Sequence, residues 1–109
     1  MSLSILVLDA AQRSALAMTR SLGRLPEVLV VTAERTADNL AGASRYSSEQ
    51  LVYPCPETKP EEFVRWMTDI TRERRFSWVF PATEVTSQLL LLVQEQIPGL
   101  RLPFAPLAK

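Results

Sequence analysis

Two short loops contain most of the side chains that could bind or transform a substrate. Asp9 and Arg13 follow one apolar run, and Thr83 and Glu84 follow another much later in the chain. A guanidinium is a planar fork of donors that suits a carboxylate or a phosphate. The free N–H groups at the start of a helix also attract anions. The first loop therefore indicates a site for a small anion.

Each of these residues also has a purely structural interpretation. Asp9 could cap the turn that follows it. Arg13 could be a solvated side chain, or it could pair with Asp9 or Glu84. Glu84 is favoured in a first helical turn by the helix dipole alone. Both interpretations of the two loops stay open at the level of sequence.

Two absences narrow the chemistry of the chain. The sequence contains no histidine, which excludes histidine acid–base catalysis, histidine metal ligands and a Ser-His-Asp triad. Its three glycines are Gly23, Gly42 and Gly99, so the loop at residues 9–13 lacks the Gly-x-Gly-x-x-Gly pattern of dinucleotide sites. We therefore expect neither catalytic residues nor metal ligands, and no tight pyrophosphate site at this loop.

Two further residues could take part in chemistry, but their sequence context is weak. Glu34 follows an apolar run, where an acidic residue can hold a ribose, although the glycine pattern that usually accompanies it is missing. Cys55 lies between Pro54 and Pro56, with no basic neighbour in sequence to lower its pKa. The sequence predicts that Cys55 is a packed or partly exposed thiol rather than a nucleophile.

The composition limits the classes of partner that the chain is expected to bind. Twelve basic residues balance twelve acidic ones, so the total charge predicts no binding to nucleic acid or to an anionic membrane surface. The longest apolar run, residues 89–93, is far shorter than the roughly 20 residues that a membrane helix needs. A single cysteine fits a reducing compartment. We expect a cytoplasmic protein.

Apolar runs and helical spacing alternate along the chain. The runs predict strands at residues 4–9, 27–32, 50–53 and 77–81, with residues 100–102 as the start of a fifth. The helical spacing predicts helices at residues 12–22, 60–74 and 83–97, and residues 34–48 indicate a short irregular helix and a loop.

Residues at the helix ends support these boundaries. Gly23 is placed to stop the first helix at its C-terminus. Thr58 and Glu61 have the spacing of a capping box, and Thr83 can cap the last helix. The last helix is apolar all round at residues 89–93. Its outer side could cover a missing domain or a second subunit, or it could belong to a larger core.

Strands that alternate with helices predict a parallel sheet with right-handed crossovers. We therefore expect a Rossmann-like, three-layer α/β domain with a mainly parallel sheet of four to five strands in the order 3-2-1-4-(5). The order reverses between strands one and four, where such folds bind ligands. The loops at residues 9–13 and 81–84 should face each other there. A signalling receiver domain is excluded, because no aspartate follows the third strand.

Several segments also match a known pattern in order and spacing. They are residues 5–9, Arg13, 15–16, 20–23, 44–46, 60–74 and 79–84. Together they resemble the opening of ATP-grasp ligases, in particular those similar to the large subunit of carbamoyl-phosphate synthase. The resemblance covers the N-terminal pre-ATP-grasp domain of these enzymes.

This resemblance implies a division of the chain and a role for it. Residues 1–102 would form the pre-ATP-grasp domain, and residues 103–109 would be an exit linker toward ATP-grasp domains. The parent enzyme would use ATP and Mg²⁺ to activate a small carboxylate as an acyl phosphate, which an amine or a thiol then attacks. This chain alone would be inactive and would hold neither group tightly. The residues implied to face the substrate and nucleotide cleft are Asp9, Arg13, Ser44, Arg45, Thr83 and Glu84.

Two other functions remain open from the sequence. The chain could be a stand-alone Rossmann-type module that binds a nucleotide or a small anion. It could also be an interaction domain that forms a homodimer through the apolar helix at residues 83–97.

Overall fold

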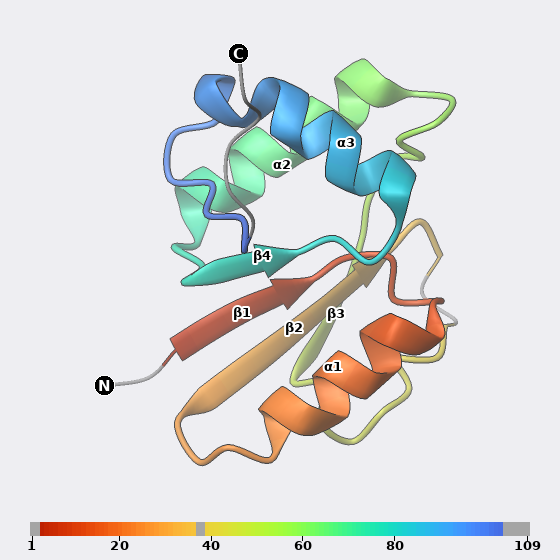
Figure 1. Ribbon diagram of the computed structural model, residues 1–109, viewed down its shortest axis with the longest axis vertical. Helices are drawn as coiled ribbons and strands as arrows, with labels where there is room; N and C mark the ends of the chain where they lie inside the picture. The colour runs from red at the N-terminus through yellow and green to blue at the C-terminus, as the bar shows by residue number, and fades with distance from the viewer. Residues whose placement is uncertain (1–2, 37–38, 104–109) are drawn as a thin grey trace.

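The computed structural model describes residues 3–36 and 39–103. Its four strands form one sheet in which every neighbouring pair is parallel, in the order β3-β2-β1-β4 (Figure 1). The predicted α/β class and the strand order 3-2-1-4 are therefore confirmed. The strands are β1 (Leu3–Val7), β2 (Val28–Glu34), β3 (Glu49–Val52) and β4 (Trp78–Phe80).

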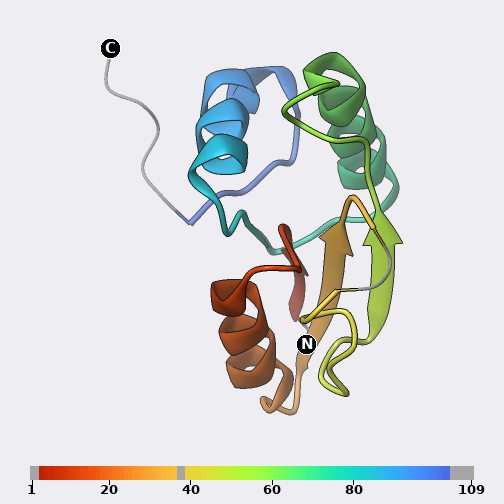
Figure 2. The ribbon, with the colours of Figure 1, turned by 90° about the vertical axis from the view of Figure 1, so that its right-hand side faces the viewer.

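Helices cover both faces of the sheet and make the fold three-layered (Figure 2). The elements are α1 (Arg13–Gly23), α2 (Pro60–Glu73), α3 (Glu84–Val93) and the short 3₁₀ turn η1 (Gln94–Gln96). α1 lies on one face, and α2 and α3 lie on the other (Figures 1 and 2). Such helices on opposite faces are typical of a doubly wound, Rossmann-like arrangement.

Alternate residues along the strands pack into two separate hydrophobic cores, one on each face of the sheet. In β1, Ile5 and Val7 point to the α1 side, whereas Leu6 points to the side of α2 and α3. This alternation follows from the two-residue period of a strand. The core under α2 and α3 is the larger one and includes Phe63 and Met67, both fully buried.

The larger core also covers much of the apolar α3. Leu90 is fully buried, and Ile97 and Leu100 return after η1 to pack in the same cluster. Leu92 remains 69% exposed. Of the two explanations for the apolar run at residues 89–93, the larger core therefore accounts for most of it.

The expected fifth strand does not form within the described residues. The Val79 N–H donates a hydrogen bond of 2.8 Å to the Arg101 carbonyl, but no ladder extends from this contact. Gly99 has a φ of 86°, which turns the chain just before this point, and Pro103 has no N–H to donate. The rest of the predicted linker, residues 104–109, lies outside the described residues.

The connection from β2 to β3 differs from the prediction. β2 extends to Glu34, and the described part of residues 35–48 contains turns but no helix. Asn39 explains part of this, because its side chain accepts the Gly42 N–H at 2.7 Å. Short polar side chains compete in this way with helical backbone bonds.

One of the predicted helix ends is wrong in detail, and the other two are confirmed. The N-cap of α2 is Lys59 rather than Thr58, and no side chain caps the helix, which begins with Pro60 in its favoured first position. Gly23 is the last residue of α1 and does not have a positive φ. A Cβ there would lie 2.6 Å from that of Tyr46, so glycine is required by close approach. Thr83 does cap α3, accepting the Thr86 N–H.

Candidate functional site

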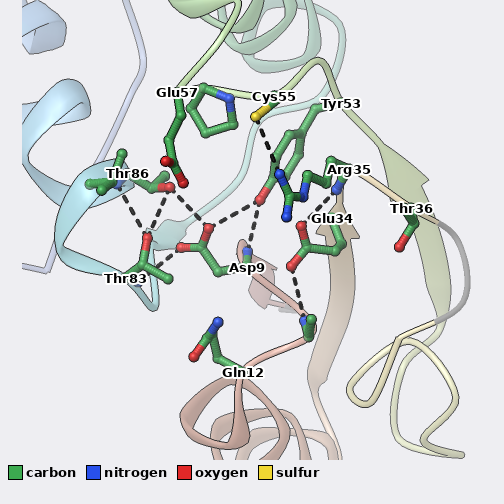
Figure 3. A pocket seen from close by; sticks show the side chains of 13 residues that line it. Asp9, Gln12, Glu34, Arg35, Thr36, Tyr53, Cys55, Glu57, Thr83 and Thr86 are labelled. Atoms are coloured by element: carbon green, nitrogen blue, oxygen red, sulfur yellow. Dashed lines mark hydrogen bonds between the residues drawn. The ribbon is translucent and has the colours of Figure 1, made fainter.

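A cleft of about 460 Å³ lies at the carboxyl ends of β1, β2 and β3, beside the first turn of α3 (Figure 3). The strand order predicts a site at this position, because β1 is followed by a helix on one face of the sheet and β4 by a helix on the other face. The polar side chains that line it come from four separate segments of the chain. They are Asp9, Gln12, Glu34, Arg35, Thr36, Tyr53, Cys55, Glu57, Thr83 and Thr86.

Asp9 joins the two loops that meet at the cleft. Its side chain is buried, with 6% of the residue exposed, and its backbone has a φ of 56°. Asp and Asn tolerate this left-handed conformation better than most residues. One carboxylate oxygen, Oδ2, accepts the N–H groups of Ala82 at 2.8 Å and Thr83 at 2.9 Å. The predicted meeting of the two loops therefore occurs, and Asp9 holds it.

The other carboxylate oxygen of Asp9 is equally occupied. Oδ1 accepts the Thr86 hydroxyl at 2.9 Å and the Tyr53 hydroxyl at 3.2 Å, while the Tyr53 oxygen accepts the Asp9 N–H at 3.1 Å (Figure 3). A carboxylate has about four acceptor positions, and all four are used here. Asp9 therefore acts as a brace between β1, the end of β3 and α3.

Tyr53 is held as a donor in this network. Burial is the main cause that raises the pKa of its hydroxyl, and the carboxylates of Asp9 and Glu34 raise it further. The ring also packs edge-on against Phe63, with 5.0 Å between centroids. The hydroxyl consequently stays protonated across the physiological range and keeps its bond to Asp9.

Glu34 forms a second brace, at the end of β2. Only 8% of this residue is exposed. Its Oε1 accepts the Ala11 N–H at 3.1 Å, and its Oε2 accepts the Arg35 N–H at 2.8 Å. The carboxylate thus fixes the loop between β1 and α1 against the end of β2. Burial of the charge is balanced by these donors.

Cys55 and Arg35 lie together at the rim of the cleft. The Arg35 Nη1 lies 3.5 Å from the Cys55 sulfur. Hydrogen bonds from Thr58, then from the Glu57 backbone and from Arg35, lower the pKa of the Cys55 thiol to about 7. Cys55 has no basic neighbour in sequence, but the fold brings the Arg35 guanidinium to it from the end of another strand.

The cleft contains two of the six predicted residues, Asp9 and Thr83. Arg13 is exposed in the first turn of α1, and Glu84 is exposed in that of α3, where it accepts a hydrogen bond of 3.1 Å from Gln88. Neither of these two residues lines the cleft.

The other two predicted residues lie away from the cleft. Ser44 and Arg45 lie in the turn before β3, near the last residue of α1. This places them toward the amino ends of the strands, away from the cleft. The Arg45 guanidinium donates to the Tyr46 hydroxyl at 2.8 Å and lies 4.9 Å from the centre of its ring. Its nearest described partner is thus an aromatic ring rather than the cleft.

Sequence reasoning did not single out Tyr53 and Thr86. A weak signal exists for both, since Tyr53 directly follows a strand at the edge where ligands bind, and Thr86 lies in the first turn of a helix beside that edge. Their bonds to Asp9 span 44 and 77 residues of chain, which a local pattern cannot reveal.

Two features of the cleft suit the binding of an anion. The start of α1 has no side-chain cap and no acidic residue in its first turn, and Gln12 just before it lines the cleft. Arg35 adds a cation at the rim. Within residues 3–36 and 39–103, no group of three His, Cys, Asp or Glu side chains could hold a metal ion.

No protein-family model matches the chain, and no curated protein matches its sequence. Among the described helices, none combines the length and the apolar character required to cross a bilayer. The class that the structure defines is therefore a Rossmann-like α/β domain with a polar cleft at its topological switch point.

Proposed function

We propose that the chain is the N-terminal, substrate-side domain of an ATP-dependent ligase of the ATP-grasp type, similar to the large subunit of carbamoyl-phosphate synthase. In this proposal the domain is not catalytic alone and forms one wall of a cleft for a small carboxylate. The observation that carries the proposal is the cleft at the switch point, where Asp9 ties the loop after β1 to the loop after β4.

Rigidity of the wall supports a substrate-positioning role. The carboxylate oxygens of Asp9 and Glu34 accept hydrogen bonds from backbone N–H groups and hydroxyls of the protein. In this proposal the two carboxylates therefore shape the cleft instead of coordinating a ligand. A substrate carboxylate would then contact the guanidinium of Arg35 and the exposed start of α1. Preorganised donors of this kind orient a substrate without reorganisation on binding.

ATP and Mg²⁺ belong to the other domains in this proposal. The described residues lack a three-ligand metal site, and the loop after β1 has no glycine for close approach to a pyrophosphate. The ATP-grasp domains of the same polypeptide would therefore hold the nucleotide and the metal. When bound there, the nucleotide would supply the phosphoryl group that activates the carboxylate.

The gene itself offers the most direct test. We expect the reading frame to continue past Lys109 into a glycine-rich ATP-grasp sequence. In the full-length protein, Arg35→Gln should raise the KM for the carboxylate about tenfold and leave kcat nearly unchanged, because uniform binding is lost. Arg20→Gln, an exposed arginine of α1 that does not line the cleft, is the matched control. A stop codon directly after Lys109 would contradict the proposal.

A stand-alone binding module is the second candidate. It is favoured by the cleft itself, to which residues after β1, β2 and β3 and the first turn of α3 all contribute. Calorimetric titration with ATP, NAD and AMP separates the two candidates. Micromolar binding by the isolated chain, lost in Arg35→Gln, would favour the module. The ligase-domain proposal predicts no heat of binding from any of the three nucleotides.

A further inference from the structure

A second hollow lies at the opposite end of the sheet from the cleft. Its volume is about 580 Å³, and it is formed by the last turn of α2, the residues that enter β4, and the segment at residues 98–101. Three of its eight lining residues are arginines and none is acidic. The lining residues are Thr71, Arg72, Arg75, Phe76, Ser77, Pro98, Gly99 and Arg101.

Among the described residues, the three guanidinium groups lack a charge partner. Arg74, which lies between two of them in sequence, pairs with Glu49 at 2.7 Å. Within residues 3–36 and 39–103, by contrast, Arg72, Arg75 and Arg101 make no ion pair. The hollow therefore concentrates three positive charges in a chain whose total charge is zero. Like charges at close range repel unless an anion lies between them.

Support of the helix end does not explain all three arginines. The C-terminus of α2 carries a partial charge of about −0.5, which one cation in the last turn is enough to balance. Arg72 occupies that position. Arg101 comes from a different segment, and its guanidinium stacks on the Trp78 ring with 4.8 Å to the centroid. Arg75 and Arg101 therefore leave a positive surplus at the hollow.

Two residues in the wall of the hollow, Gly99 and Thr71, have uncommon features. Gly99 has no side chain and a φ of 86°, a conformation that disfavours replacement by a larger residue. Thr71 is 4% exposed, and its buried hydroxyl has no hydrogen-bond partner among the described residues. Unpaired buried polar atoms are uncommon in folded proteins.

We propose that this hollow binds a tetrahedral oxyanion of the phosphate class, either free phosphate or the phosphate group of a small molecule. A guanidinium can donate two parallel hydrogen bonds to two oxygens of one phosphate group. Three cations balance the two or more negative charges of phosphate or pyrophosphate, whereas a single carboxylate would leave most of them unpaired. The site is independent of the proposed ligase role, since it lies at the amino ends of the strands.

Calorimetric titration of the chain at constant ionic strength tests the proposal, with inorganic phosphate, pyrophosphate and a phosphate monoester as probes. We expect binding that is tighter for pyrophosphate than for phosphate. Arg75→Gln and Arg101→Gln should each weaken it about tenfold, because each removes a charged hydrogen-bond donor. Arg65→Gln is the matched control, since it removes the same charge from α2 outside the hollow.

The outcomes separate the sources of the phosphate and the alternatives. Tighter binding of the monoester than of phosphate would identify a phosphorylated small molecule, and the reverse order would identify free phosphate; both support the proposal. It is overturned if pyrophosphate does not bind at about 10 mM, which corresponds to negligible affinity. Equal weakening by Arg65→Gln, or binding of an oligoglutamate peptide in place of the phosphate probes, would overturn it as well.

Discussion

The two ends of the sheet use charged side chains in opposite ways. At the carboxyl end, the carboxylates of Asp9 and Glu34 are buried and their oxygens accept donors from the protein. At the amino end, Arg72 and Arg75 are exposed and make no ion pair within the described residues. The two buried carboxylates at one end have their charges satisfied by the fold, whereas Arg72 and Arg75 at the other end have no charged partner within the described residues.

Burial decides which of the two roles a charge takes. A buried carboxylate costs several kcal/mol of desolvation unless hydrogen bonds replace its water. Asp9 meets that requirement with four donors, so the network becomes part of the fold's stability. An exposed guanidinium keeps its hydration and contributes little to folding. Mutations at the carboxyl end should therefore affect stability far more than mutations at the amino end.

The largest effect is expected from Asp9→Ala. The change leaves the N–H groups of Ala82 and Thr83 without their acceptor and also requires alanine to adopt a positive φ. We expect a loss of about 4 kcal/mol in the free energy of unfolding, measured by urea denaturation. Glu84→Gln, an exposed carboxylate in the adjacent turn, should change it by less than about 0.5 kcal/mol.

A second substitution separates strain from lost hydrogen bonds. Asparagine tolerates a positive φ, but one end of its amide donates rather than accepts. Asp9→Asn should therefore cost about 2 kcal/mol, roughly half the effect of alanine. If Asp9→Asn were as stable as the wild type, the Asp9 carboxylate would not act as a brace.

Tyr53→Phe should have the next largest effect. It removes the hydroxyl that donates to Asp9 Oδ1 and accepts the Asp9 N–H, while the ring keeps its packing against Phe63. We expect a loss of about 1–2 kcal/mol by urea denaturation. Tyr46→Phe serves as the control, since its hydroxyl bonds to the exposed Arg45, and it should stay within about 0.5 kcal/mol of wild type. Equal losses in both variants would remove the distinction between buried and exposed networks.

Cys55 tests whether the carboxyl end also presents a reactive group at its rim. With a pKa of about 7, the thiol should react with iodoacetamide at a rate that rises with pH around a midpoint near 7. Thr58→Val removes the main cause of the low pKa, so the midpoint should rise and the rate at pH 7 should fall about fivefold. Thr36→Val, at the same cleft, should leave the profile unchanged. A wild-type midpoint near 9 would refute this.

The smallest effect is expected at the amino end, from Arg74→Gln. The Arg74 and Glu49 side chains form two hydrogen bonds, of 2.7 and 2.8 Å, but both are more than one-third exposed. We expect a loss of no more than about 0.5 kcal/mol, reduced further by salt. A loss above about 2 kcal/mol would show that the amino end also depends on its charges.

The same pair has a defined pH dependence. Hydrogen bonding to Arg74 lowers the pKa of Glu49 in the folded chain. The small contribution of the pair is therefore present above the unfolded pKa of Glu49 and is lost as the pH falls through the lower, folded pKa. The difference in unfolding free energy between wild type and Arg74→Gln should vanish at low pH.

Much of the fold could be predicted because its signals are local. The apolar runs identified all four strands, and their alternation with helices predicted the parallel order 3-2-1-4. That order in turn predicted that the loops containing Asp9 and Thr83 would meet. Parallel strands bring their carboxyl ends to one edge whatever the side chains are.

The details of the site could not be predicted in the same way. Glu34 is a weak ribose candidate by sequence, yet in the fold it holds the loop at Ala11. The resemblance implied a place at the cleft for Ser44 and Arg45, but they lie beyond the last turn of α1 and away from the cleft. Each of these placements depends on the length and direction of intervening elements. No local pattern contains that information.

The sequence by itself determined the α/β class, the strand order and the edge where a ligand site could form, since these follow from hydrophobic period and chain connectivity. Only the tertiary structure decided what each charge does. Asp9 became a buried brace because Tyr53, Thr83 and Thr86 converge on it, and Arg72, Arg75 and Arg101 became a cluster because the chain turns back at Gly99. A charge takes its role from the water it loses and the partners it meets, and both are set by residues distant in the chain.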